Sequence, residues 1–209
     1  MRLLAVTDFH NTFDRLPEIL KKAGKVDGTL LAGDLTQFGP TDNAKDVLGA
    51  LPKPVLAVPG NCDRRDIVDL LRAEDCNLHE NKFRMGDVTF IGIGGSNPTP
   101  FNTPFELSEE QIESALERLL RDVKGPAVLV SHAPPKGYRD EVPGGIHAGS
   151  TAIARYLPRF AAVVCGHIHE DRGISKADGT VIVNPGPASI GNAAILTIDE
   201  KGHAKVDLI

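Results

Sequence analysis

The chain has 209 residues, 41% of them hydrophobic and 24% charged, which is the balance of an ordinary soluble globular protein. A chain of this length suits one large domain or two small ones, and the length itself favours one. The net charge of −5, without a Lys/Arg block, argues against a nucleic-acid or membrane surface, and no apolar stretch approaches the roughly 20 residues of a membrane span.

Cysteine usage and the first residues predict a cytoplasmic location. Cys62, Cys76 and Cys165 are odd in number and widely spaced, unlike a disulfide framework. The opening apolar residues run directly into Asp8 and lack the signature of a cleaved leader.

Strands and helices are predicted to alternate through the first two-thirds of the chain. Near-continuous apolar runs predict buried strands at residues 3–6, 26–32, 55–58, 88–93, 127–130 and 161–165. Helical periodicity predicts helices at residues 11–24 with Asn11 as the cap, at 42–51, behind Asp63, behind a Ser108–Gln111 capping box, and at 151–157.

The last third of the chain changes character. Residues 173–183 and 194–208 each predict two strands around a turn, with Asp178-Gly179 as the signal of the first hairpin. Two Pro/Gly-rich loops are also expected, at residues 94–107 and 133–149, and the second is long enough to be functional. These patterns indicate an α/β (α+β) fold in one domain, residues 1–209.

Polar residues of metal-binding type follow five of the predicted strands. They are Asp8, His10, Asp34, Asn61, His132, His167 and His169. Because ligands bind beyond the carboxyl ends of strands in open α/β sheets, we expect these side chains to converge on one crevice. Asp8 and His10 would face the same side if their backbone stays extended. Gly33, Gly60 and Gly166 precede ligand-type residues and indicate turns or close backbone approach.

This inventory fits two divalent cations better than one. Three carboxylate or amide side chains and four imidazoles exceed the four ligands of a closed zinc site. The mixed nitrogen and oxygen set favours Mn, with Fe, Zn, Ni or Co as alternatives, over Mg or Ca. Two metals roughly 3.5–4 Å apart would clamp an oxyanion and share a bridging hydroxide as nucleophile. The pattern therefore predicts phosphoester hydrolysis.

Each residue has a simpler interpretation when taken alone. Asp34 could be a turn or helix-cap residue, and His79 and His203 are expected to be solvated. The joint pattern favours a site, since four of the seven histidines follow strands.

In this order, the motifs resemble the calcineurin-like metallophosphoesterase superfamily. They are Asp8-Phe9-His10, Gly33-Asp34, Gly60-Asn61-Cys62-Asp63, Ser131-His132 and Gly166-His167-Ile168-His169. The chain is most similar to small single-domain prokaryotic phosphoesterases related to Icc-type phosphodiesterases. The resemblance implies a four-layer αββα sandwich of two mixed β-sheets flanked by helices.

The resemblance also implies a dinuclear metal centre bridged by Asp34. One metal ion would take Asp8, His10 and His169, and the other would take Asn61, His132 and His167. Asn184-Pro185-Gly186 resembles the loop that often ends the family's series of motifs, and its role is expected to be structural. Independently of the resemblance, Asp63 is expected to cap the helix that follows it.

Cys62 departs from the family pattern, in which many members carry His to contact the phosphate or protonate the leaving oxygen. A thiol with a pKa of about 8.5 is a weak donor. The change favours diesters or substrates with good leaving groups. His147 is the candidate replacement donor; alternatively, it is a loop histidine that packs within residues 133–149. Cys62 could also ionise beside a helix start and cations. The predicted catalytic residues are Asn61, Cys62, His132 and His147.

Several functions stay open at this point. The preferred interpretation is a metal-dependent phosphodiesterase. The alternatives are a phosphomonoesterase of the same class, a non-catalytic scaffold or interaction protein, and a metal or nucleotide sensor. The expected partner is a small phosphoester, including a nucleotide, and a homodimer is a further expectation. Polar loop residues could line the crevice or be solvated, namely Asn97, Thr99, Thr103, Lys136, Tyr138 and Arg139.

Overall fold

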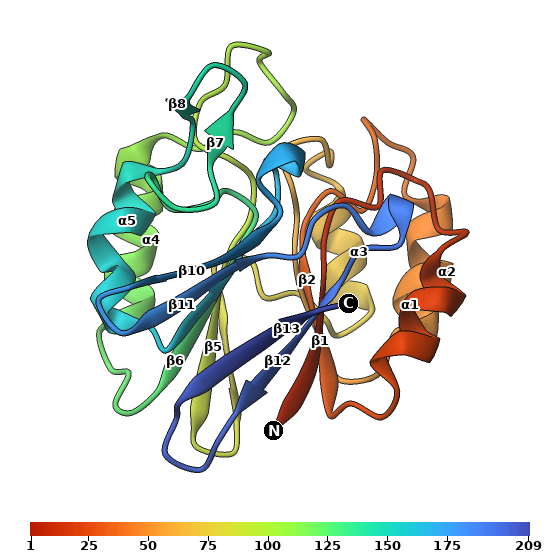
Figure 1. Ribbon diagram of the computed structural model, residues 1–209. Coiled ribbons are helices and arrows are strands. Elements are labelled where there is room, and N and C mark those ends of the chain that lie inside the picture. The colour runs from red at the N-terminus through yellow and green to blue at the C-terminus, as the bar shows by residue number, and fades with distance from the viewer.

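Two mixed β-sheets pack face to face in the computed structural model, which describes residues 1–209 apart from the side chain of Asn43 (Figure 1). The first sheet has the strand order β13-β12-β1-β2-β3. Its strands are β1 (Arg2–Val6), β2 (Gly28–Ala32), β3 (Val55–Val58), β12 (Ala194–Ile198) and β13 (Ala204–Leu208). β1, β2 and β3 are parallel, whereas β12 and β13 form the second predicted hairpin.

The second sheet has the order β10-β11-β9-β6-β5-β4. Its strands are β4 (Lys82–Met85), β5 (Val88–Ile93), β6 (Ala127–Ser131), β9 (Ala162–Val164), β10 (Gly173–Ala177) and β11 (Thr180–Asn184). β5, β6, β9 and β11 are parallel, and antiparallel β4 and β10 form its edges. A short hairpin, β7 (Glu141–Val142) and β8 (Ile146–His147), stands apart from both sheets.

Helices cover the outer face of each sheet (Figure 1). α1 (Leu16–Ala23), α2 (Asp42–Ala50) and α3 (Ile67–Ala73) lie on the first sheet, and α4 (Glu109–Leu120) and α5 (Thr151–Tyr156) on the second. Short 3₁₀ helices follow at η1 (Leu157–Arg159), η2 (His169–Asp171) and η3 (Ala188–Ile190). The predicted four-layer αββα sandwich is confirmed. Among the described residues, no helix has the length and hydropathy needed to cross a membrane.

Strand alternation divides the apolar residues between two cores. In β1, Leu3 and Ala5 belong to the core between the sheets, whereas Leu4 and Val6 belong to the core beneath the helices. Successive side chains on a strand point to opposite faces, so strands covered on both sides must be apolar throughout. Because the inter-sheet core joins the two sheets, we propose that residues 1–209 form one domain.

The register brings the carboxyl ends of the parallel strands to one edge of the sandwich. Val6 of β1 pairs with Leu31 of β2, and Ala32 pairs with Val58 of β3. In the second sheet Val130 of β6 pairs with Val164 of β9. The loops that follow these strands therefore meet at the same end of the molecule, which is uppermost in Figure 1.

The predicted start of the first helix is wrong. α1 begins at Leu16 with Arg15 at its N-cap position. Asn11 has a φ of 60° and donates its backbone N–H to the Leu35 carbonyl, while the N–H of His10 bonds to the carbonyl of Asp34. The segment after β1 thus continues to pair with the segment after β2 before the helix can begin.

Two elements have no sequence prediction. β4 is an exposed edge strand that carries Lys82 and Arg84, so its sequence lacks the apolar run by which the other strands were predicted. The β7/β8 hairpin lies inside the loop expected at residues 133–149 and has only two residues per strand. The capping box of α4, formed by Ser108 and Gln111, is confirmed.

Candidate metal centre

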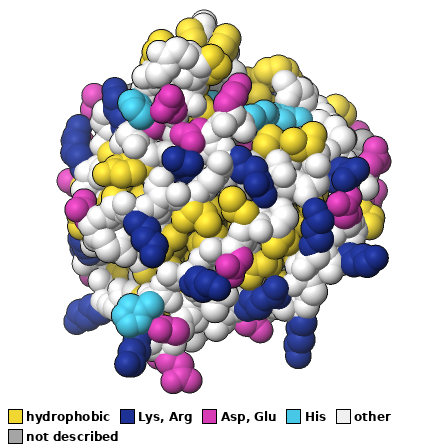
Figure 2. Space-filling model, in the orientation of Figure 1, with side chains coloured by type: hydrophobic (Ala, Val, Ile, Leu, Met, Phe, Trp, Pro, Cys, Tyr) yellow, Lys and Arg dark blue, Asp and Glu magenta, His cyan; other side chains and the backbone are white. Residues whose placement is uncertain are grey.

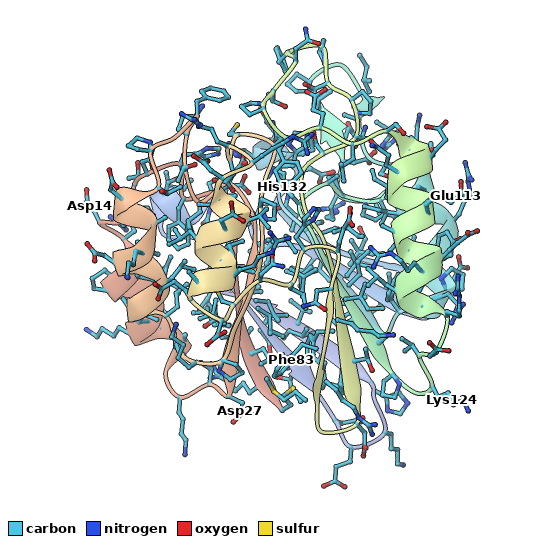
Figure 3. The ribbon with its side chains drawn as sticks, turned by 180° about the vertical axis from the view of Figure 1, so that it is seen from behind. Asp14, Asp27, Phe83, Glu113, Lys124 and His132 are labelled. Atoms are coloured by element: carbon cyan, nitrogen blue, oxygen red, sulfur yellow. The ribbon has the colours of Figure 1, made fainter. Side chains whose placement is uncertain are left out.

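The seven candidate ligands come together where the loops of both sheets meet, and His132 is labelled there in Figure 3. Asp8 and His10 were expected to face the same side on an extended backbone. That explanation is wrong, because the backbone is not extended at either residue. Asp8 has a φ of 56° and His10 of 47°, and Asp34 and His167 also occupy the left-handed region. Asp, Asn and His enter that region more readily than other non-glycine residues. A tight turn, rather than a strand, therefore directs these side chains.

Glycine permits the close approach of these turns, as predicted. A Cβ on Gly60 would collide with the Asp34 carboxylate, and one on Gly166 would collide with the Thr7 hydroxyl and come within 2.6 Å of Asp8 Oδ2. At Gly33 it would lie 2.6 Å from His132 Nδ1. The three glycines therefore leave the space in which the two sheets bring their polar groups together.

One cluster consists of Asp8, His10 and His169. His169 Nε2 lies 3.3 Å from Asp8 Oδ1, and His10 Nε2 lies 3.6 Å from the same oxygen. The two imidazole nitrogens are 3.2 Å apart. Asp8 Oδ2 is held by the Thr7 hydroxyl and the His167 N–H, whereas buried Asp8 Oδ1 has no hydrogen-bond partner. An unpartnered buried carboxylate oxygen facing two imidazole nitrogens fits a cation site.

The second cluster consists of Asn61, His132 and His167. His132 Nε2 and His167 Nδ1 each lie 2.8 Å from Asn61 Oδ1. His132 Nδ1 lies 2.7 Å from the Ala32 carbonyl. That contact requires a proton on Nδ1, which leaves the Nε2 lone pair for a metal ion in the neutral ring.

Asp34 stands between the clusters. Its Oδ2 lies 3.7 Å from His10 Nε2 and 3.4 Å from His132 Nε2. Its Oδ1 accepts the backbone N–H of Cys62 at 2.8 Å. One carboxylate oxygen therefore faces an imidazole from each cluster.

The buried carboxylates and imidazoles of the site shift one another's pKa values. Burial raises the pKa of the Asp34 carboxyl, but His132 and His10 more than offset it, so the net pKa lies well below its usual range. Burial opposes charging of His132, yet the Asp34 and Asp8 carboxylates raise the pKa of its ring to about 9. Burial, and then the charge on His132, lower the pKa of His167 to about 4. Without metal, the protonated His132 ring thus helps to neutralise buried Asp8 and Asp34, and a metal bound at its Nε2 would displace that proton.

Cys62 is close to the centre but is not poised to ionise. Its sulfur lies within 4.8 Å of ligand atoms of His10 and Asp34. Burial, and then the Asp34 carboxylate, raise the pKa of the Cys62 thiol well above its usual range. α3 begins only at Ile67, so the expected helix start beside the thiol is absent. The expectation that a helix start favours the thiolate is therefore wrong.

Asp63 does not cap a helix, and that prediction is also wrong. Its buried carboxylate accepts hydrogen bonds from the Leu35 N–H at 3.2 Å, the Gly60 N–H at 2.8 Å, and both the N–H and hydroxyl of Thr36 at 2.7 Å. Asp63 therefore ties the turn that carries Asp34 to the turn that carries Asn61. Sequence spacing gives no signal for this long-range contact.

His147 is not brought into contact with the seven ligands among the described residues. Its Nδ1 lies 2.7 Å from Asp140 Oδ1, and its side chain is 45% exposed. The hairpin that carries it is joined to the His169 segment, because the Glu141 N–H donates to Asp171 Oδ2 and Arg139 forms an ion pair with Asp171 at 3.0 Å.

Other polar loop residues hold the loops together. Thr99 and Thr103 donate their hydroxyls to Glu106 at 2.6 and 2.7 Å and so close their own loop. Asn97 donates to the Ala148 carbonyl and links the two loops. His79 is half-buried and accepts the Gly94 N–H at 2.9 Å, so the expectation of a solvated ring is wrong.

The comparisons with known proteins agree with this arrangement. The family model described as calcineurin-like phosphoesterase matches residues 1–171. This chain therefore belongs to the calcineurin-like phosphoesterase family, whose members are metal-dependent hydrolases of phosphoesters.

Particular relatives cover nearly the whole chain. "Uncharacterized protein MJ1162" of Methanocaldococcus jannaschii is 36% identical over 198 residues, 90% of this chain and 89% of that protein. An archaeal phosphodiesterase structure covers 100% of both chains at 15% identity and a TM-score of 0.55. The 5'-nucleotidase of Candida albicans matches 99% of this chain and 50% of its own at 10% identity and a TM-score of 0.67. The two structures share the fold.

The close approach at Gly60 gives the first test. We predict that Gly60→Ala displaces Asp34 and abolishes Mn²⁺ binding in calorimetry, with a loss of stability of about 2 kcal/mol or more, because the added Cβ overlaps the carboxylate. Gly49→Ala is the matched control, since its Cβ meets nothing within 4 Å inside α2. The control should gain roughly 0.5–1 kcal/mol and bind Mn²⁺ normally. Unchanged Mn²⁺ binding by Gly60→Ala would contradict the prediction.

Proposed function

We propose that this chain is a phosphodiesterase that uses two divalent metal ions, with Mn²⁺ as the first candidate. The observation that carries the proposal is the position of Asp34 Oδ2, 3.7 Å from His10 Nε2 and 3.4 Å from His132 Nε2. A single carboxylate shared by two histidine-bearing clusters suits a pair of cations better than one.

The proposed ligand sets follow the two clusters. Asp8, His10 and His169 would hold one ion, Asn61, His132 and His167 would hold the other, and Asp34 would be the ligand shared by both. When bound, such a pair supplies a hydroxide nucleophile at neutral pH and charge neutralisation for the phosphate oxygens. The carbonyl of Ala32 keeps the His132 ring oriented, and the Cys62 N–H orients the Asp34 carboxylate. Asn61 and His132, whose side chains lie 2.8 Å apart, are proposed to act both as ligands and in catalysis.

The nature of the leaving group follows from the residue at position 62. A neutral thiol is a weak hydrogen-bond donor, so Cys62 gives little help in protonating a departing oxygen. This favours diesters with good leaving groups over monoesters. A phosphomonoesterase is the same-class alternative.

His147 is the proposed second proton donor. Its hydrogen bond to Asp140, and then the charge of that carboxylate, raise the pKa of the His147 ring, which favours the protonated donor form. The same bond fixes Nδ1 and leaves Nε2 for a substrate. His147 is also paired across the hairpin with Glu141, whose N–H is bonded to Asp171 in η2. The hairpin that carries the donor is thus fixed to the segment of His169.

Metal-dependent turnover tests the proposed activity. The Mn²⁺-loaded protein should hydrolyse bis(4-nitrophenyl) phosphate faster than 4-nitrophenyl phosphate, and Asp34→Asn should lower kcat at least 100-fold because the bridge loses its charge. His203→Ala is a control histidine, exposed and paired with Asp199 far along the chain. Wild-type turnover no higher than that of Asp34→Asn would refute the activity and favour a scaffold or sensor.

Substitution of Cys62 tests the diester preference. Cys62→His should raise monoesterase relative to diesterase activity about tenfold or more, because the imidazole restores a donor at the leaving oxygen. Cys62→Ser has no titratable ring and should leave the ratio near that of the wild type. The ratio of kcat/KM values for the mono- and bis-aryl phosphates is the measurement, and an unchanged ratio in Cys62→His would assign the preference to another part of the site.

The leaving-group dependence of His147 variants tests the second donor. His147→Ala should lower kcat about 100-fold on a cyclic nucleotide, whose alkoxide leaves poorly, and only a few-fold on bis(4-nitrophenyl) phosphate. His203→Ala provides the matched comparison, because it also removes an exposed histidine paired with a carboxylate. Equal effects of His147→Ala on both substrates would contradict the role of His147 as a proton donor.

A further inference from the structure

Large apolar side chains are exposed around the metal centre. Among the described side chains, four of the six exposed large hydrophobic residues lie in segments that connect the main strands and helices at this end of the sandwich, and we call them the apolar rim. They are Phe38 at 52% exposure, Phe101 at 81%, Ile146 at 63% and Ile190 at 67%. Figure 2 shows histidine side chains on the upper surface with hydrophobic side chains beside them.

Hydrogen bonds tie each of these loops to a segment that carries candidate ligands. The Phe38 N–H donates to the Cys62 carbonyl at 2.9 Å, and the Ser189 N–H, next to Ile190, donates to the Asp8 carbonyl at 3.3 Å. In the loop of Phe101, the Phe105 N–H donates to the Asn61 carbonyl at 3.1 Å. In the hairpin of Ile146, the Glu141 N–H donates to the Asp171 side-chain oxygen Oδ2 at 3.0 Å. The apolar rim is thus distributed over four segments that are bonded to ligand-bearing segments, rather than gathered into one continuous patch.

Among the four residues of the apolar rim, Phe38 has the backbone conformation that its packing in the folded chain explains least. Its φ is 59°, in the left-handed region that a bulky residue rarely adopts, and Gly39 follows with a φ of 102°. Half of the ring is exposed, so Phe38 gains little burial in return for this backbone conformation. Backbone strain at an exposed aromatic beside a reactive centre points to a contact made outside the folded chain.

The position of Phe38 defines what that contact would be. Its backbone is hydrogen-bonded to Cys62, whose sulfur is within 4.8 Å of ligand atoms of the centre, so the loop that carries Phe38 borders the place where a phosphate would be held. An aromatic face stacks on another planar ring with little demand for hydrogen-bond partners. An exposed aromatic residue on a loop that borders the metal centre therefore suits an aromatic or heteroaromatic substituent of the phosphate.

We propose that Phe38 is a specificity-determining residue that stacks on an aromatic ring of the substrate, so that the enzyme selects phosphodiesters with an aryl or nucleobase-type substituent. This inference rests on the proposed phosphodiesterase activity and adds the substrate class.

A comparison of a ring-bearing and a ringless ligand tests the proposal. Phe38→Ala should raise KM for bis(4-nitrophenyl) phosphate about 5- to 10-fold with kcat within about twofold, and leave the inhibition constant of inorganic phosphate unchanged, because phosphate has no ring to stack. Phe38→Tyr should restore KM. Phe83→Ala is the matched control, since Phe83 is 42% exposed at the end of the molecule opposite His132 (Figure 3).

Thermal unfolding provides a readout apart from activity. Phe38→Asn removes the ring but suits the left-handed backbone, so its Tm should equal or exceed that of the wild type while its KM rises as in Phe38→Ala. A sharp fall in Tm would make Phe38 a structural residue and overturn the proposal.

The remaining outcomes separate this inference from the proposed function. An unchanged KM in Phe38→Ala overturns the stacking role while leaving the activity in place. The same holds if the inhibition constant of inorganic phosphate rises as much as the KM does. A dimer in sedimentation that is lost in Phe38→Ala with KM unchanged would also overturn it and make the rim an interface between copies. Absence of Mn²⁺-dependent turnover in the wild type refutes the proposed function, and the substrate class falls with it.

Discussion

Two buried carboxylates, Asp8 and Asp34, set the constraint on which the rest of the site depends. Both are almost fully buried, and charged groups in that position need opposite charge close by. The surrounding imidazoles meet this need only in part, and Asp8 Oδ1 keeps no hydrogen-bond partner. A pair of cations between the two histidine-bearing clusters would complete the compensation. The family to which the chain belongs is metal-dependent, in agreement with this requirement.

The fold holds these charges together through contacts that are not themselves ligands. Asp63 joins the turns after β2 and β3 by four hydrogen bonds, and glycine at position 60 lets the Asp34 carboxylate pass against the backbone. Ala32 accepts from the His132 ring, so the first sheet orients a histidine that the second sheet supplies. The packed sandwich thus fixes the relative positions of groups from both sheets, and the inter-sheet core stabilises the site.

The sequence was sufficient to predict the strand-helix alternation, the two terminal hairpins and the set of polar residues at strand ends, because burial of whole strands leaves long apolar runs. It could not predict contacts between turns distant along the chain. Asp63 was expected to cap a helix, and Asp8 and His10 were expected on an extended backbone, since local patterns do not report left-handed turns or long-range acceptors. The strained Phe38 had no signal at all, because only the backbone angle distinguishes it from an ordinary loop residue.

The central claim is that Asp34 bridges two metal ions held by separate clusters. Anomalous diffraction at the manganese absorption edge, from crystals grown with Mn²⁺, tests this claim most directly. We expect two anomalous peaks roughly 3.5–4 Å apart, one beside Asp8 and His169, the other beside Asn61 and His167, with Asp34 between them. A single peak, or two peaks that Asp34 does not join, would contradict it.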